Sequence, residues 1–364
     1  MEQIFAHIKS IGIFTIILSI MIIVHEWGHF ITAKKLGVRV EKFSIGFGKK
    51  LYSRVIDGTE FIISAIPLGG YVKPAGEDRS TCKGTPDEFY SQSPGRRSLI
   101  VLNGPMVNII FAYVVFIFVF MLGYPDLSTS ISNVIDDYPA KTAGIQVDDK
   151  VLAVNGVAVE NWTELQTAIA KSTTPELLFK IQRGEDMVDI RLQPKIDSGK
   201  DIFGVVREKR MVGIQPKPDI ISLRYDFLTS TRKALDKMVE IVTMTYQALY
   251  HMIFGSMSPK DAVAGPIGIY SVVKLAAEAG FSHVLYVMGV ISASLGIFNL
   301  LPIYPLDGAH ICLFGLEKIR GRALPRKVDE IIARLGLTFI ILLALFVFYL
   351  DITRLEWVQS LLNK

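Results

Sequence analysis

Four long apolar runs alternate with more polar stretches along the chain. Each run approaches the roughly 20 apolar residues that a helix needs to cross a bilayer, and each contains few charged residues. The runs are 11–33, 99–123, 284–303 and 331–350. The pattern therefore predicts a polytopic α-helical membrane protein with four transmembrane helices. The first run lacks a strongly basic start and a small-residue cleavage site, so we expect it to be retained rather than removed as a signal peptide.

The Lys and Arg residues between these runs indicate an orientation. Residues 34–97 carry twelve Lys or Arg residues and residues 315–330 carry five, whereas the first ten residues carry only Lys9. Cytoplasmic loops of membrane proteins are enriched in Lys and Arg. We therefore expect both loops in the cytoplasm and both termini on the outer side.

The segment 124–283 lies outside by this topology, and it begins with a soluble-looking module. Alternation of apolar and polar residues in 177–181 and 188–192 predicts a β-hairpin. Helical spacing of apolar residues in 162–170 predicts a helix before the hairpin. The later stretch 225–257 mixes charged with apolar residues, which favours an amphipathic helix on the membrane surface over a fifth span.

Composition supports a membrane protein and excludes some other classes. Half of the 364 residues are hydrophobic, and the mean hydropathy is +0.39. The net charge of +4 disfavours a dedicated nucleic-acid-binding protein, because such proteins concentrate a strong basic patch. The two cysteines, Cys82 and Cys312, are too few for a disulfide framework and have no Cys-x-x-Cys partner, so we expect free thiols.

The first apolar run ends in the sequence His-Glu-Trp-Gly-His, at His25 to His29. On a helix, His25 and His29 lie on one face and can share a zinc ion, while Glu26 reaches a metal-bound water and accepts its proton. Soluble proteins sometimes contain this short pattern by chance. Ionisable groups within a membrane helix are costly, however, so here the pattern indicates function.

A catalytic zinc takes a third protein ligand, which should lie at a similar depth. Asp307 follows the third apolar run, at the same expected cytoplasmic end as the two histidines. His310 is a rival ligand from the same turn. A simple helix N-cap is the structural alternative for Asp307, and that role can coexist with ligation. Asn299 and the nearby prolines interrupt the run, and a bilayer tolerates such irregular backbone only beside protein or a water-filled cavity.

Together these motifs resemble the site-2 protease family of intramembrane zinc metalloproteases, and the resemblance covers nearly the whole chain. The motifs that carry it are 25–29, Gly46-Phe47-Gly48, 66–73, Asn103-Gly104-Pro105 with Asn108, Gly265-Pro266-Ile267, 299–308 and 351–355.

The resemblance implies a role for several of these residues. It implies that His25, His29 and Asp307 bind Zn²⁺ and that Glu26 is the general base. It also implies that Asn299 and Pro302 contact the substrate near the metal.

The family's membrane-associated β-hairpin corresponds to residues 60–73, where 61–66 is expected as a strand and Gly69-Gly70 as a turn. An edge strand there could pair with an unwound substrate, which makes Gly69 and Gly70 candidate substrate-binding residues. A hairpin that merely seals the membrane face is the alternative.

In the segment 124–218, the resemblance implies one inserted α+β PDZ domain, which binds extended peptides or filters substrates by size; a folded spacer without a ligand is the alternative. The predicted domains are a membrane core with two spans (1–123), the PDZ domain, a juxtamembrane region (219–283) and a second membrane core (284–364). Relatives with two PDZ domains exist in the family, but this interval has room for one. Tyr304-Pro305 and Ala309 also depart from the family's usual residues.

The expected function is cleavage of single-span membrane proteins in regulated intramembrane proteolysis. The resemblance implies anti-sigma factors or signal-peptide remnants as substrates, contact with membrane lipid, and a place in the bacterial inner membrane. Nucleic acid is not an expected partner. A catalytically silent PDZ scaffold is the main alternative, although the presence of Glu26 argues against it. A metal transporter is a weaker alternative, since few further polar residues occur in the spans.

Overall fold

The computed structural model describes residues 2–80, 82–200, 205–255, 257 and 264–354. The chain divides into two compact units. The first unit comprises Met1–Phe118, Thr231–Tyr246 and Val263–Lys364, and the second comprises Val119–Ser230 and Gln247–Ala262.

Among the described residues, four helices are long and apolar enough to cross a membrane, as the four apolar runs predict. They are α1 (Glu2–Lys35), α2 (Pro94–Leu122), α8 (Phe281–Asn299) and α10 (Arg326–Thr353). The stretch expected as a surface helix forms α5 (Phe227–Ile253), which does not count among the candidate spans. Its N-terminus is capped by Asp226, whose carboxylate accepts the N–H groups of Leu228 and Thr229.

The third span ends earlier than the sequence pattern predicts. Helix α8 ends at Asn299 instead of continuing to Ile303. Pro302 and Pro305 explain the early end, because proline lacks the N–H that an α-helix requires and disfavours helical geometry in the residue before it. The next helix, α9 (Asp307–Arg320), begins at Asp307 itself.

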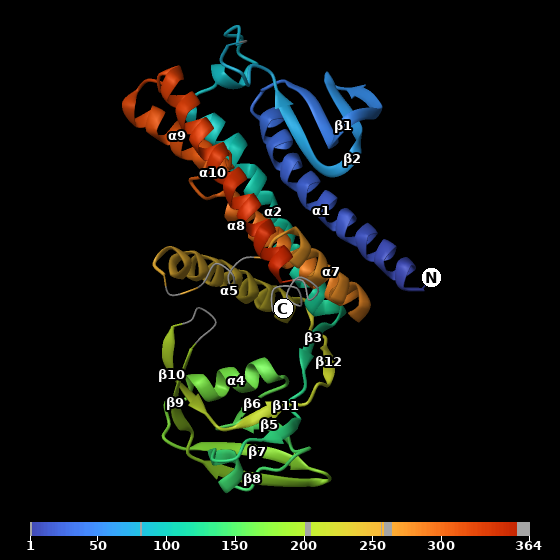
Figure 1. Cartoon of the computed structure of the whole chain (residues 1–364), viewed down its shortest axis with the longest axis vertical. Coiled ribbons are helices and arrows are strands. Elements are labelled where there is room, and N and C mark those ends of the chain that lie inside the picture. The colour runs from blue at the N-terminus through green and yellow to red at the C-terminus, as the bar shows by residue number, and fades with distance from the viewer. Residues whose placement is uncertain (1, 81, 201–204, 256, 258–263, 355–364) are drawn as a thin grey trace, which may run out of the picture. The chain divides into compact units, whose positions relative to one another are not determined.

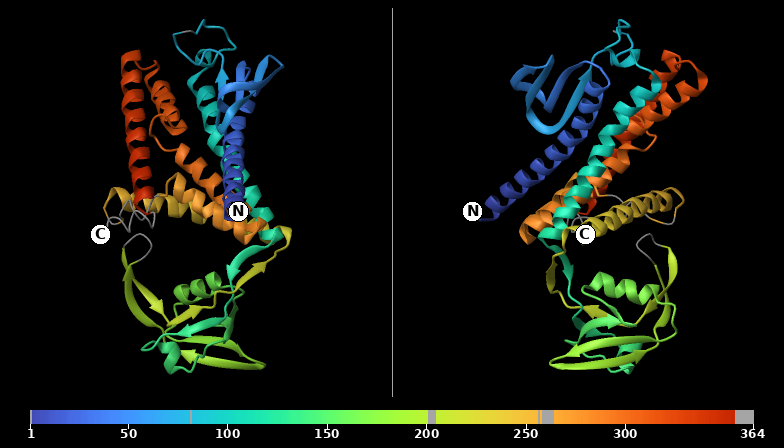
Figure 2. Two further views of the ribbon diagram at one scale, coloured as in Figure 1. Left: turned by 45° about the vertical axis from the view of Figure 1, so that its right-hand side comes forward. Right: turned by 180° about the vertical axis from the view of Figure 1, so that it is seen from behind.

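The hairpin after α1 is larger than expected. Strand β1 (Val40–Ile56) pairs antiparallel with β2 (Thr59–Pro74) around a turn at Asp57-Gly58, where both residues have positive φ. Figures 1 and 2 show the hairpin beside the C-terminal end of α1, against which it packs.

The expected turn at Gly69-Gly70 is wrong, since both glycines lie within strand β2. The first part of β2 pairs with one side of residues 42–45, and its last part, 70–73, pairs with the other side. The chain crosses between the two sides near Gly69, which has a φ of +141° and lies under the ring of Phe47. Residues 70–74 consequently form an edge of this small sheet.

A polar clamp joins α10 to α7 (Pro266–Ala279). The carboxylate of Asp351, 2% exposed near the end of α10, accepts the backbone N–H groups of Gly265, Ile267 and Gly268. These N–H groups belong to the start of α7 and have no partner within their own helix. Helix α7 also packs against α1 and α8, so the clamp fixes the end of α10 against the rest of the first unit.

The second unit contains the predicted module. Its four-stranded sheet has the order β6-β5-β7-β8, and the predicted hairpin is confirmed as β7 (Leu177–Arg183) and β8 (Asp186–Leu192). The predicted helix is α4 (Trp162–Lys171), capped by Asn161. The remaining elements are β3 (Tyr124–Leu127), β4 (Ile131–Val134), α3 (Pro139–Thr142), β5 (Lys150–Val154), β6 (Val157–Ala158), β9 (Lys195–Lys200), β10 (Val206–Met211), β11 (Ile214–Pro216) and β12 (Ile220–Leu223).

The core of this unit lies between α4 and the sheet, where Leu165, Leu177, Phe179 and Ile181 are fully buried. Outside the sheet, β3 pairs with β12 and β4 with β11. These pairings join the beginning of the module to its end. Both cysteines of the chain are free thiols, as expected.

Candidate metal centre

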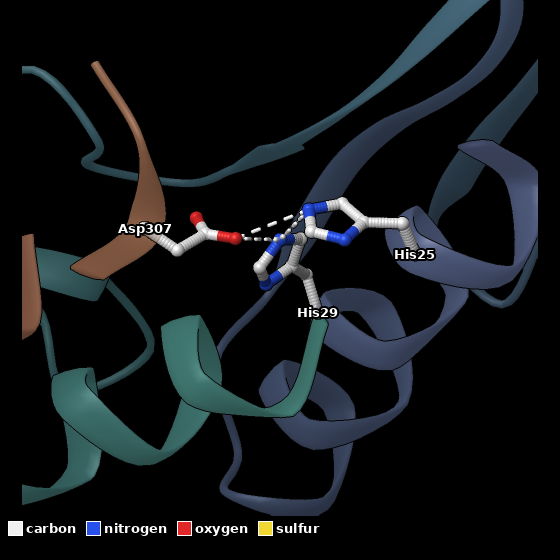
Figure 3. A group of neighbouring side chains, drawn as sticks. All are labelled: His25, His29 and Asp307. Atoms are coloured by element: carbon white, nitrogen blue, oxygen red, sulfur yellow. Dashed lines mark hydrogen bonds and ion pairs between the residues drawn. The ribbon is translucent and has the colours of Figure 1, made fainter. Parts of the chain in front are cut away.

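Three side chains from two distant parts of the chain converge in the first unit. The Nε2 atoms of His25 and His29, one turn apart on α1, lie 3.1 Å from each other. Asp307 Oδ2, from the first turn of α9, lies 3.1 Å from His25 Nε2 and 3.5 Å from His29 Nε2. Figure 3 shows the three groups pointing toward one common position.

This geometry fits a tetrahedral zinc ion. Zinc binds imidazole nitrogen and carboxylate oxygen at about 2.0–2.2 Å, so neighbouring ligand atoms lie roughly 3.3 Å apart. The three separations here are close to that value. Asp307 Oδ2 is also buried without a hydrogen-bond partner among the described residues, as expected for an atom that faces a metal ion. The three side chains could therefore hold zinc and leave a fourth position for water or substrate.

Close packing of α1 on α2 brings His29 into place. A Cβ atom on Gly28 would lie 2.3 Å from the backbone oxygen of Asn103, and one on Gly104 would lie 2.3 Å from the His29 ring. Both positions therefore require glycine. The Asn103 side chain then joins the helices by donating to the Gly28 carbonyl and to the hydroxyl of Thr32.

The second nitrogen of each histidine ring also has a partner on α2. His29 Nδ1 lies 3.0 Å from the backbone oxygen of Ile100 and donates to it, which leaves Nε2 free to bind a metal. His25 Nδ1 lies 3.3 Å from the side-chain amide of Asn108. In the sequence, Asn103 and Asn108 are recognised only as part of a family motif, without a role for either side chain. A polar residue within an apolar helix is the one sequence feature that could have indicated such a role.

The start of α9 holds Asp307 in position. Gly308 is buried, and a Cβ there would lie 2.2 Å from the backbone oxygen of Leu300, so the first turn of α9 packs tightly against the end of α8. Asp307 is not the helix N-cap, because Leu306 occupies that position. His310, the rival ligand, does not belong to the group of converging ligand atoms in the described residues.

Glu26 lies beside the edge of the hairpin sheet. Its Oε2 atom accepts the backbone N–H of Val72 at 3.0 Å. Since this N–H points toward α1, it takes no part in the pairing of β2 with β1. A Cβ on Gly70 would come 3.6 Å from Glu26 Cγ, so the carboxylate and the edge strand are close neighbours.

A cavity of about 290 Å³ adjoins the convergent side chains. His29 and Asp307 line it together with Val72, Glu77 and His310. A space of this size can hold water and a short stretch of extended peptide, which a hydrolytic site needs beside its metal.

The remaining predicted site residues do not belong to the convergent group of ligand atoms. Asn299 is half-buried at the last position of α8, and Pro302 is exposed in the loop that follows. Gly69 is buried within β2. Their contact with a substrate stays a prediction.

The sequence matches the model of peptidase family M50 over residues 13–343. A protein of Campylobacter jejuni is 34% identical over 343 residues, which cover 93% of this chain and 92% of that protein. A protein of Helicobacter pylori strain J99 is 34% identical over 352 residues, covering 93% and 98%. A protein of Vibrio cholerae is 29% identical over 444 residues, covering 94% and 98%.

All three relatives carry the name "putative zinc metalloprotease". The match to the family model reaches all four candidate spans as well as the His-Glu-x-x-His sequence, and it ends within α10. The chain therefore belongs to peptidase family M50, the site-2 protease family, and is a zinc-dependent metalloprotease with the character of a membrane protein.

Proposed function

We propose that this protein is an intramembrane endopeptidase in which His25, His29 and Asp307 bind the catalytic zinc and Glu26 is the general base. The observation that carries the proposal is the convergence of three ligand atoms from α1 and α9, with separations close to those of a tetrahedral zinc site. Glu26 follows His25 directly in α1, a helix that is long and apolar enough to span a membrane.

Each group has a defined task in this scheme. Bound zinc supplies Lewis acidity, which polarises the scissile carbonyl and lowers the pKa of water. Glu26 takes the proton from the attacking water and passes it to the leaving amine. The N–H of Val72 orients the Glu26 carboxylate through the bond at 3.0 Å, and the two histidines are oriented through their Nδ1 atoms.

The edge of β2 offers a way to open the substrate. A helical substrate hides its carbonyl groups in its own hydrogen bonds, so it must unwind before attack. Residues 70–74 pair with β1 on one side and face Glu26 on the other. An extended substrate segment can add to this edge by backbone pairing, beside Gly70 and Glu26, with Asn299 and Pro302 contacting it near the metal. Gly69 lies under the ring of Phe47, so its part is to set the course of the edge strand.

The proposed substrates are single-span membrane proteins, either anti-sigma factors or signal-peptide remnants, as for the bacterial regulator of sigma-E protease. The second unit is proposed to be the PDZ domain, which binds a peptide or limits access by size. Its sheet of short strands and its helix α4 support this assignment. The Lys/Arg bias of the loops supports an inner-membrane location, with the active site near the cytoplasmic side and the PDZ domain outside.

The variant Glu26→Gln tests the proposal. The amide cannot accept the proton from water, so cleavage of a single-span model substrate by the purified protein should fall by about 100- to 10,000-fold while zinc content stays the same. Glu278→Gln is the matched control, because Glu278 is an exposed glutamate on α7. Cleavage products would be measured by mass spectrometry, which also locates the cut bond.

Undiminished cleavage by the Glu26→Gln variant would contradict the proposed chemistry. If the Glu26→Gln variant does not cleave but still performs the protein's function in the cell, the result would favour the catalytically silent PDZ scaffold. A scaffold needs the folded protein and not the general base.

A further inference from the structure

Asn108 lies at the contact between α2 and the catalytic helix. Its side chain is completely buried, and its amide lies 3.3 Å from His25 Nδ1. The other atom of the amide, Oδ1, is buried without a hydrogen-bond partner among the described residues. Among the described residues only the amide atom that faces His25 has a hydrogen-bond partner, so this one contact decides the orientation of the amide.

Metal ligation determines which nitrogen of His25 carries the proton. His25 Nε2 faces His29 Nε2 and Asp307 Oδ2, so Nε2 is the atom that can bind zinc. A neutral imidazole that binds through Nε2 carries its proton on Nδ1, and this N–H needs an acceptor. For His29 the backbone oxygen of Ile100 is that acceptor.

For His25 the corresponding acceptor is the oxygen of Asn108. The oxygen and nitrogen of an asparagine amide are distinguished only by their hydrogen bonds. With Nδ2 toward His25, two N–H donors would face each other in the zinc-binding tautomer. Turning the amide by half a rotation places Oδ1 within hydrogen-bond distance of the Nδ1 proton. The geometry thus supplies an acceptor where the chemistry requires one.

The backbone around Asn108 is fixed from the opposite side. The hydroxyl of Ser292 on α8, also fully buried, donates to the Asn108 backbone oxygen at 2.9 Å. Gly296, one turn later, approaches α2 so closely that a Cβ would lie 2.8 Å from the backbone oxygen of Pro105. Asn108 is therefore held between α1 and α8, with little freedom to leave His25.

We propose that Asn108 is a positioning residue that accepts the Nδ1 proton of His25 and so fixes the tautomer and ring orientation needed to bind zinc. The inference rests on the proposed ligand set. Asn108 does not touch the substrate; it acts on zinc affinity through His25. Removing such an outer partner of a metal-binding histidine typically lowers metal affinity by about 10–100-fold.

The test measures the zinc affinity of the full-length protein in detergent, by competition with a chromophoric chelator. Asn108→Leu has nearly the same volume but no acceptor, and its affinity should fall by about 10–100-fold. Asn108→Asp can only accept, so its affinity should equal or exceed that of the unmodified chain. Asn133→Leu is the control, since Asn133 is an exposed asparagine on β4 whose amide contacts Gln215 and neither histidine ring; its zinc affinity should equal that of the unmodified chain.

The Asp variant keeps the proposal falsifiable even where Asn108→Leu does not fold. If Asn108 donates to His25, a carboxylate cannot replace it, and Asn108→Asp should lose affinity as strongly as Asn108→Leu. That result, or normal zinc affinity in Asn108→Leu, would overturn the proposal. Both results are zinc affinities and do not depend on cleavage. A negative result for Asn108 can therefore be distinguished from a negative result of the Glu26→Gln test. If the unmodified chain binds no zinc, the ligand set itself is wrong.

Discussion

Single residues at the α1–α2 contact determine whether the histidines can meet a metal. Gly104 leaves the space that the His29 ring fills, and Asn103 ties the two helices together one residue earlier. The carbonyl of Ile100 orients the ring from its other nitrogen. The position of the His29 ring thus depends on the missing side chain at Gly104 as well as on its own hydrogen bond.

We predict that Gly104→Ala weakens zinc binding by at least tenfold. The added methyl group would lie 2.3 Å from the His29 ring, so the ring must leave its position or the helices must separate. Zinc affinity by chelator competition measures the effect. Gly95→Ala is the control, because a Cβ at Gly95, also on α2, meets no atom within 4 Å. Equal zinc affinity in the two variants would contradict this account of the packing.

The proposed zinc ligands and general base could be named from the sequence, and the residues that orient them could not. His25, Glu26 and His29 follow a local spacing on one helix, and Asp307 follows from matching depth. The partner of His25 depends on how α2 packs on α1, which no local pattern reveals. The contact of Glu26 with Val72 could not be predicted either. It is made by a backbone N–H, a group that almost every residue type has, so the residue type at position 72 does not indicate it.

Whole elements were predicted best where their pattern is long and regular. The four spans, α4 and the β7–β8 hairpin follow directly from periodicity. The β1–β2 hairpin was only half predicted, although Asp57-Gly58 is a strong signal for a two-residue hairpin turn. The turn was predicted at Gly69-Gly70 instead, but both glycines lie within β2. The pairings of β3 with β12 and β4 with β11 join segments far apart in the chain, so local sequence could not indicate them.

An ion pair in the second unit makes its strands sensitive to acid. Asp149, 1% exposed before β5, receives two hydrogen bonds of 2.8 Å from Arg183 at the end of β7. Burial alone would raise the pKa of Asp149, but Arg183 and the N–H of Gln146 hold it below its usual value. A lowered carboxylate pKa stabilises the fold at neutral pH, and this contribution is lost as the pH falls below about 4.

We predict that Arg183→Gln lowers the stability of β5 and β7 by about 3 kcal/mol at pH 7, because it leaves the Asp149 carboxylate buried without its partner. The difference from the unmodified chain should shrink as the pH falls through the lowered pKa of Asp149 and the carboxylate takes up a proton. Hydrogen exchange of the backbone amides in these strands, followed against pH, measures both effects. Arg191→Gln on β8, an exposed position, is the control. A difference that does not change with pH would contradict the assignment to Asp149.

At the scale of the whole molecule, the site joins the two ends of the chain. Two of the proposed zinc ligands come from α1 and the third from α9, and the intervening sequence contains the β1–β2 hairpin, two further candidate spans (α2 and α8) and the entire second unit. The early end of α8 at Asn299 is what allows α9 to begin with Asp307. The sequence indicated this break through its prolines but placed the end of the helix too late.

Metal analysis of three purified proteins, dialysed against a mild chelator, tests the central claim most directly. The unmodified chain and His310→Ala should each retain about one zinc per chain, because His310 stands outside the convergent group. Asp307→Ala should lose its zinc, since two histidines alone do not complete a catalytic site. Retention of zinc by Asp307→Ala together with its loss from His310→Ala would contradict the account and make His310 the third ligand.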